Sequence, residues 1–132
     1  MRAPMVKAVV RAMDTISAFL NETRGLTINK YGLSGSSKRG WTTWIAGAID
    51  PRVIAFTPIV MSLLNESANM HHYYRSLGGW PYEFEDYYFE NITKNIDEPE
   101  SALLWEIVDP YSYVERMNKP KLMVSSSNDE FF

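Results

Sequence analysis

The sequence of 132 residues predicts an α/β fold in which parallel strands alternate with helices. Three observations predict it. Residues 4–20 place apolar side chains at helical spacing, residues 53–60 (VIAFTPIV) form a continuous apolar run of strand length, and residues 41–49 form a helical segment between that run and an earlier strand-like stretch. Strands that are separated by helices favour a parallel sheet with right-handed crossovers.

The first 60 residues are expected to form five elements. Gly25 can take the left-handed position that ends a helix, and Pro51 ends the second helix because proline disfavours helical geometry in the residue before it. Pro58 belongs near the end of its strand, since it cannot donate to a sheet. The continuous apolar run predicts a strand that is covered on both faces. In order, the elements are a helix over 4–20, a strand over 26–33, a turn over 35–40, a largely buried helix over 41–49 and a strand over 53–60.

Residues 61–108 have a different character, because they hold both histidines, two of the four tryptophans and most of the tyrosines. We expect an inserted helical cap here. The part from 109 to 132 is expected to contain a short helix and a late, buried strand. The chain opens within a helical pattern and stops soon after a strand, so we expect a partial domain, truncated at both ends. The expected elements are helices near 63–75, 82–96 and 99–107, a short helix over 112–117 and the strand over 120–126 (PKLMVSS).

Composition excludes several classes of function. The net charge of -3 provides no basic surface for nucleic acid. No apolar run approaches the ~20 residues that span a bilayer, and no signal peptide is visible. Without cysteine, disulfides and thiolate metal sites are excluded, and we expect no metal site and no cofactor. Three glycosylation sequons, at Asn21, Asn65 and Asn91, are either chance matches or the mark of a secreted glycoprotein.

The stretch GSSKRGWTTW, residues 35–44, joins the expected strand to the expected helix. In an α/β-hydrolase the nucleophile sits on a strained strand-to-helix turn between small residues, usually as G-x-S-x-G. Two registers compete. Residues 32–36 (GLSGS) have serine where the second glycine should be, whereas Gly35 and Gly40 bracket Ser37 with the second glycine one residue late. We favour Ser37, because its register ends a strand before the turn and starts a helix after it.

Ser37 would then be a catalytic nucleophile. The backbone amide of Lys38 would point at the oxyanion, helped by the positive end of the following helix. Lys38 or Arg39 would add charge beside an anionic transition state or hold an acidic substrate. The alternative is structural: Ser36 or Ser37 caps the helix by accepting a hydrogen bond from a free amide.

Asp129 is the candidate triad acid, because in such folds the acid follows a late strand. It would orient a histidine base, so we expect a gap of roughly 6–9 Å between Ser37 and Asp129. The alternative is that Asp129 caps the next turn. His71 and His72 precede Asp129, against the order Ser, acid, His, and adjacent residues of a helix face different directions. We interpret both as surface or half-buried positions of a helix and expect the catalytic histidine outside this chain. This chain alone should then be inactive.

Several segments carry a family resemblance: SSKRGWTTWIAGAIDPRV, YRSLGGWP, IVDPYSYVERMNKPKLMVSSSNDEFF and the opening MVKAVVRAMDTISAFL. Together they resemble the PhoPQ-activated pathogenicity-related protein family, which includes autocrine proliferation repressors of amoebae. The resemblance covers nearly the whole chain. It implies an α/β-hydrolase-like fold and secreted or periplasmic members, and it carries Ser37 over as nucleophile and Asp129 as acid.

Two functions follow from these observations. The first is a serine hydrolase that acts on an ester or amide bond of a small molecule or peptide, with residues 61–108 as a cap over the site. The second is a secreted signalling or binding protein on a hydrolase scaffold, which recognises a cell-surface partner without turnover. The aromatic side chains of the cap fit either function.

Overall fold

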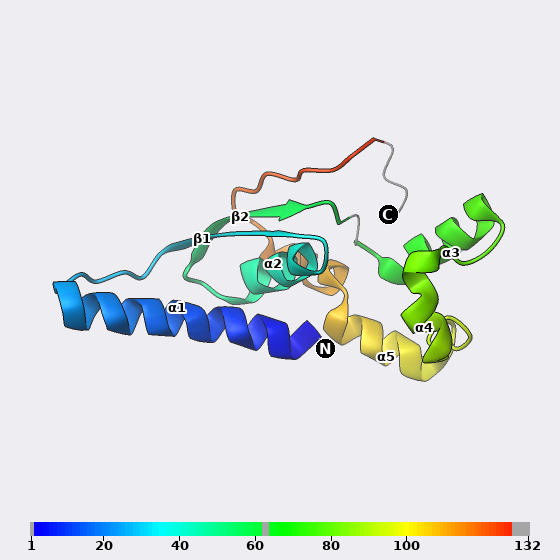
Figure 1. The fold of residues 1–132 in the computed structure, drawn as a ribbon, viewed down its shortest axis with the longest axis horizontal. Helices are drawn as coiled ribbons and strands as arrows, with labels where there is room; N and C mark the ends of the chain where they lie inside the picture. Colours follow the sequence, from blue (N-terminus) through cyan, green and yellow to red (C-terminus); the bar gives the residue numbers. More distant parts are fainter. Residues whose placement is uncertain (1, 62–63, 128–132) are drawn as a thin grey trace.

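The structure is a computed structural model that describes residues 2–61 and 64–127 (Figure 1). It is a mixed α/β structure with a two-stranded parallel sheet and several helices, as the sequence predicts. None of the described helices is long and apolar enough to cross a membrane. The elements are α1 (Arg2–Arg24), β1 (Tyr31–Ser36), α2 (Lys38–Ile49), β2 (Val53–Ile59), α3 (Glu66–Leu77), the 3-10 helix η1 (Tyr82–Phe84), α4 (Glu85–Phe89), α5 (Pro99–Val108) and the 3-10 helix η2 (Pro110–Arg116).

The sheet pairs β1 with β2 in parallel, and α2 forms the crossover between the two strands. Exposure alternates along β1, and Ile54 on β2 is 49% exposed. The expectation that residues 53–60 are covered on both faces is therefore wrong for the described part of the chain. One face is covered because α1 and α2 pack on it through a shared apolar cluster that includes Met13, Trp44 and Phe56.

The first strand is shorter than the sequence predicts. Residues 26–30 are not part of it, and Leu26 is 52% exposed. The strand begins only at Tyr31, whose hydroxyl donates to the Met13 carbonyl of α1 at 2.8 Å. Before that point the chain crosses from the end of α1, where Gly25 takes the predicted left-handed conformation at φ 64. Alternation of apolar residues alone could not separate this connection from the strand.

Helix α2 lies at the centre of the core, and its two tryptophans are buried as predicted. Trp41 is 2% and Trp44 3% exposed. Trp44 meets Phe56 of β2 edge-on, with ring centroids 5.5 Å apart. The indole Nε1 of Trp41 donates to the Val108 carbonyl at 2.6 Å, which joins α2 to the end of α5. Although α2 is short, it connects the strands to the insertion, because Trp44 packs against β2 and Trp41 is bonded to the end of α5.

The segment after η2 lies beside β2 but is not the predicted buried strand. It forms isolated parallel bridges, Phe56 with Lys121 and Ile59 with Val124, and Leu122 is 64% exposed. Hydrogen bonds join the segment to Phe56, to the carbonyl of Pro58 and to Val60, the residue after β2. Pro58 has no N–H to donate, so one hydrogen bond of the ladder is missing between the two bridges and no continuous strand forms.

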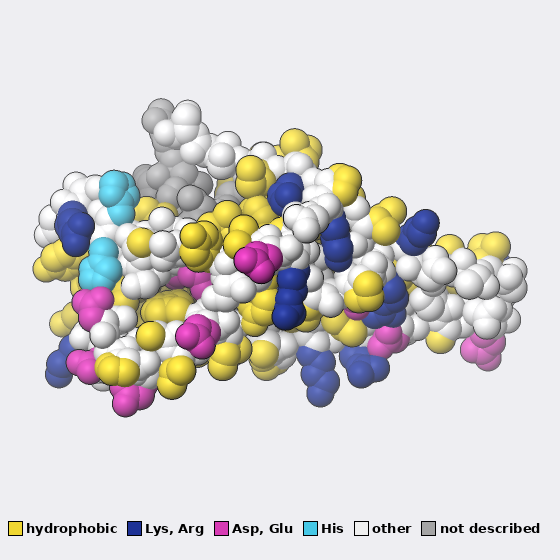
Figure 2. All heavy atoms as spheres, turned by 180° about the vertical axis from the view of Figure 1, so that it is seen from behind, with side chains coloured by type: hydrophobic (Ala, Val, Ile, Leu, Met, Phe, Trp, Pro, Cys, Tyr) yellow, Lys and Arg dark blue, Asp and Glu magenta, His cyan; other side chains and the backbone are white. Residues whose placement is uncertain are grey.

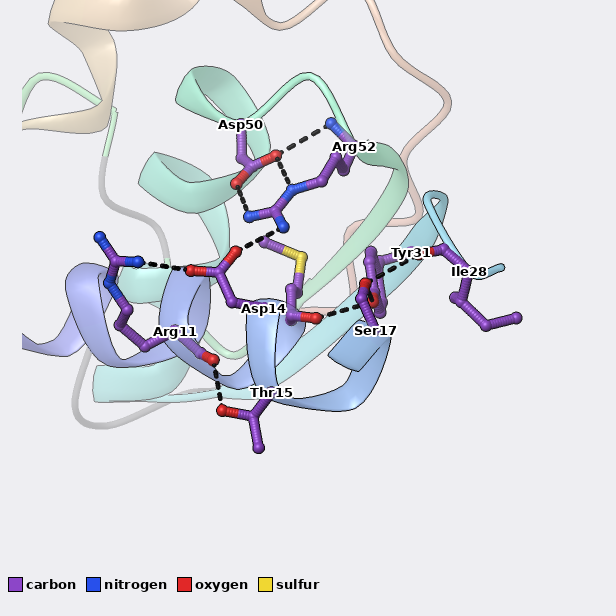
Figure 3. Close-up of polar contacts among 9 residues, drawn as sticks. Arg11, Asp14, Thr15, Ser17, Ile28, Tyr31, Asp50 and Arg52 are labelled. Carbon is purple, nitrogen blue, oxygen red and sulfur yellow. Dashed lines mark hydrogen bonds and ion pairs between the residues drawn. The ribbon is translucent and has the colours of Figure 1, made fainter. Parts of the chain in front are cut away.

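A polar network fixes the end of the sheet opposite the Ser37 turn (Figure 3). Arg52 donates to the carboxylates of Asp14 and Asp50, at 2.7 and 2.8 Å. The side-chain hydrogen bond from Arg52 is the main reason that the pKa of Asp50 lies below its usual value. Lys119 donates to the carbonyl of Asp50 at 2.7 Å, which satisfies an acceptor at the end of α2. The network ties α1, the start of β2 and the chain after η2 to one point.

The insertion is helical as predicted, but its elements differ from the expected ones. The expected helix over 82–96 is wrong: the structure has η1, the short α4, and turns from Glu90 to Asp97. Asn91 has a positive φ of 58, which no helix accommodates, and this residue lies where the predicted helix fails. Helices α3, α4 and α5 lie together at one end of the molecule, beyond the end of α1 that carries the N-terminus (Figure 1).

Candidate active site

Ser37 occupies the turn between β1 and α2, where the sequence places it. Its backbone has φ 52 and ψ -128, a conformation that residues other than glycine rarely adopt. The turn is held by the Ser37 amide, which donates to the Ile59 carbonyl of β2 at 2.9 Å. The side chain makes no capping hydrogen bond, although an N-cap serine normally makes one from an extended backbone. Ser37 is thus exposed on a strained turn, without the side-chain hydrogen bond that the capping alternative requires.

The glycines on either side of Ser37 are required by close backbone contacts. A Cβ atom on Gly35 would lie 2.6 Å from the Arg39 carbonyl oxygen and 2.8 Å from Thr43 Oγ1. On Gly40 it would lie 3.0 Å from the Ile59 carbonyl oxygen. The tight spacing of strand and helix therefore depends on residues without a side chain. The competing serine, Ser34, lies within β1 and is not on the turn.

We expect Gly35→Ala to destabilise the protein by about 1–3 kcal/mol, the usual cost of an over-packed site. The added methyl group meets backbone of α2, which cannot move without opening the turn. Gly32→Ala is the matched control, because it adds the same atom on the same strand and nothing lies within 4 Å of it. Urea unfolding of both variants measures the difference. Equal midpoints would contradict this account of the turn.

The start of α2 presents free amides beside Ser37. Within the described part of the chain, Trp41 is the first residue of the helix whose amide donates to a backbone carbonyl, that of Ser37, at 3.2 Å. The amides of the first turn, beginning with Lys38, have no acceptor within a helix, and this end of the helix favours negative charge. Lys38 and Arg39 both have exposed side chains, and only Lys38 lies on the wall of the pocket described next.

A pocket of about 400 Å³ opens next to Ser37. Its walls come from the start of α1, the start of α2 and, for the most part, the insertion over 61–108. Trp41, Phe84 and Trp105 supply apolar surface. Arg2 also lines the pocket. Its guanidinium stacks on the Trp41 ring at 3.7 Å and donates to the Tyr87 hydroxyl at 2.8 Å. Residues of the insertion thus border the same pocket as the serine.

Acidic side chains of the insertion also line the pocket. Glu66 is only 1% exposed, and its Oε2 has no hydrogen-bond partner in the described part of the chain. Burial, followed by the nearby charge of Asp109, raises the pKa of Glu66 to about 8. Glu83 buries both carboxylate oxygens, and neither has a partner among the described residues. Buried polar groups are nearly always hydrogen-bonded, so carboxylate oxygens without partners are an unusual feature of this pocket wall.

Asp109 closes the base of the insertion. Its carboxylate accepts from the amides of Glu66 at 2.6 Å, Asn65 at 3.3 Å and Tyr111 at 2.8 Å. One side chain therefore caps both the start of α3 and the start of η2. This arrangement holds Glu66 at the pocket wall and keeps a second negative charge next to it.

The other predicted site residues are placed as follows. His71 and His72 lie on α3, and His71 Nε2 is 2.7 Å from Asp97 Oδ1. Histidine side chains are visible at the surface of the end that carries α3, and neither residue lines the pocket beside Ser37 (Figure 2). Asp129 lies outside the described residues, so its predicted distance from Ser37 stays a prediction. The segment that leads to it reaches the same sheet edge as the turn, because Ile59 bridges Val124 and also pairs with Ser36.

Sequence reasoning missed the acidic wall of the pocket. Glu66 follows Asn65 and precedes an amphipathic stretch, a pattern that indicates an ordinary acid in the first turn of a helix. Arg2 belongs to the helical pattern near the start of the chain, and Glu83 to an aromatic segment with several acids. No local pattern distinguishes these residues from surface charges. Only the packing of the insertion and of the start of α1 against α2 brings them to Ser37.

Comparison with known proteins identifies the family. The family model for PhoPQ-activated pathogenicity-related protein matches residues 1–132. The chain is also 44% identical, over 131 residues, to autocrine proliferation repressor protein A of Dictyostelium discoideum. The match covers 99% of this chain and 26% of that relative. No solved structure matches significantly. The chain belongs to the PhoPQ-activated pathogenicity-related protein family.

Proposed function

We propose that this chain is part of an α/β-hydrolase-type serine hydrolase that cleaves an ester or amide bond. The observation that carries the proposal is the backbone of Ser37, at φ 52 and ψ -128 between a strand and a helix, with its side chain uncapped beside a pocket of about 400 Å³. A strained turn of this kind costs free energy and persists where the exposed position of the side chain is used.

In the proposed reaction, Ser37 Oγ attacks the substrate carbonyl carbon and its proton passes to a histidine base. The carbonyl oxygen becomes an oxyanion that accepts from the Lys38 amide at the positive end of α2. The leaving alcohol or amine takes the proton back, and water then releases the acyl group by the same route. We assign the base to a histidine of a longer chain and its orienting acid to Asp129. The relative, of which this chain matches 26%, supports a longer protein.

A second function is favoured by the name of the relative, which refers to repression of proliferation and to no reaction. In this case the protein would be a secreted signal that uses the same scaffold to bind a cell-surface partner. The asparagines of all three sequons, Asn21, Asn65 and Asn91, are exposed, which supports a secreted glycoprotein under either function.

The experiment is to treat the full-length protein with a fluorophosphonate probe, which reacts with activated serines. We expect labelling at Ser37 that Ser37→Ala abolishes. Ser34→Ala, which removes an exposed serine of β1, should leave the labelling intact. Asp129→Asn should lower turnover of an activated ester by about 10³–10⁴-fold, as loss of the orienting acid does elsewhere. Thermal unfolding of each variant controls for folding. A well-folded full-length protein that takes no label would refute the hydrolase and leave the signalling protein.

A further inference from the structure

The pocket beside Ser37 contains buried acceptors without donors. Glu66 Oε2 and both carboxylate oxygens of Glu83 are buried and have no partner in the described part of the chain. Glu66 is 1% exposed, so bulk water does not reach its side chain. A buried oxygen without a donor costs free energy, so each such group in a native protein needs a physical reason, and a donor that binds in the pocket is one.

The charges around the pocket favour a cationic partner. Four acids line it, whereas its two basic residues are Arg2 and Lys38. Arg2 already stacks on Trp41 and donates to Tyr87. The four acids are Glu66, Glu83, Asp86 and Glu90.

A metal ion does not explain these acids. Among the described residues no group of three or more aspartate, glutamate or histidine side chains is arranged to hold one. The wall between the acids is aromatic and aliphatic, with Trp41, Phe84 and Trp105 on it. Carboxylates next to aromatic faces suit an organic cation, which hydrogen-bonds at its N–H groups and lays its apolar part on the rings.

We propose that the pocket binds a primary ammonium, guanidinium or amidinium group, with Glu66 and Glu83 as its acceptors. Binding of the cation does not depend on the proposed function. Only the further statement that the cation is part of the substrate rests on it, and in that case the hydrolase prefers esters or amides that carry a basic group. Burial and Asp109 raise the pKa of Glu66 to about 8, and a cation in the pocket provides the opposite charge that returns this carboxylate to its ionised form.

The test compares two ligands of nearly the same shape, benzamidinium and neutral benzamide, on the full-length protein. Tryptophan fluorescence reports binding, because Trp41 and Trp105 line the pocket. We expect benzamidinium to bind about tenfold or more tightly than benzamide. Glu66→Gln and Glu83→Gln should each remove most of this preference while leaving benzamide binding unchanged. Glu100→Gln, at an exposed acid of α5 outside the pocket, is the control with the same substitution and should keep the preference.

Equal affinity of the two ligands for the wild-type protein would overturn the proposal, as would a preference that survives both glutamine variants. If Glu66→Gln does not fold, Glu83→Gln decides alone. Labelling of the wild-type protein, measured beside the titration, separates this inference from the proposed reaction. A cation preference in a wild-type protein that takes no fluorophosphonate label means that the cation site stands and the hydrolase does not. Fluorophosphonate labelling without a preference for benzamidinium means that the hydrolase stands and the cation site does not.

Discussion

Replacing Trp44 by alanine is expected to lower the free energy of unfolding by about 3–5 kcal/mol, the range for deletion of a buried aromatic side chain. Trp44 is 3% exposed and packs edge-on against Phe56. It lies in the cluster that holds α1, α2 and β2 together, with Met13 and Met117 among its members. Alanine would leave a cavity that these elements cannot close without moving the strand. Guanidinium unfolding of the full-length variant measures the loss.

Substitution by phenylalanine distinguishes this packing role from a polar one. Trp44 Nε1 is buried without a partner in the described part of the chain, so Trp44→Phe keeps an aromatic ring and removes an unsatisfied N–H. Trp41→Phe instead loses the 2.6 Å hydrogen bond to the Val108 carbonyl. We expect Trp44→Phe to cost less than Trp41→Phe. The opposite order, or an unchanged midpoint for Trp44→Ala, would mean that α2 is not the centre of the core.

The free energy of unfolding is expected to fall as the pH rises from about 5 to about 8, by about 1.4 kcal/mol per pH unit from Glu66 alone. The folded protein holds this carboxyl in its neutral form up to about pH 8, whereas the ordinary value is 4.5. Between these values the folded state binds one more proton than the unfolded state. The contribution is therefore complete below pH 4.5 and is lost as the pH rises through 8.

Glu66→Gln should remove most of this slope, because glutamine keeps the shape and does not titrate. Asp109 raises and Arg2 lowers the pKa of Glu66, and both remain in the variant. Tyr87, Lys38 and Glu83 also face the pocket and are unchanged. Glu100→Gln should leave the slope as in the wild type. The measurement is urea unfolding at several pH values, without a cationic ligand. If the free energy of unfolding depends on pH in the same way for wild type and Glu66→Gln, this prediction is wrong.

The sequence predicted well what local pattern determines. The helical stripe of α1 and the apolar run of β2 each predict the type of their element, and the structure has a helix and a strand at these places. The turn expected over 35–40 is shorter, because β1 runs to Ser36 and α2 begins at Lys38, which leaves Ser37 between them. The sequence also predicted the burial of Trp41 and Trp44, because their spacing puts them with Ile45 on the packed side of a helix.

What depends on distant contacts could not be predicted. The late strand fails because Pro58 interrupts its hydrogen bonds, a fact that concerns β2 and not the segment from 120 to 126. Whether a face of the sheet is exposed depends on which other elements pack against it, and the apolar composition of a strand does not predict that. The acids of the pocket come from α3, from η1, and from α4 and the residue after it, and they meet Ser37 only through the packing of the insertion.

The carboxylate of Asp109 has a further consequence for the architecture. It accepts from Asn65 and Glu66 where the insertion leaves the sheet, and from Tyr111 just after the insertion returns. The two ends of the insertion are thus hydrogen-bonded to the same side chain. The ends of a segment attached in this way are fixed independently of its length, so its length can change at little cost in chain entropy. A change in the insertion can then alter what the pocket recognises, while one aspartate keeps both ends of the insertion beside the serine turn.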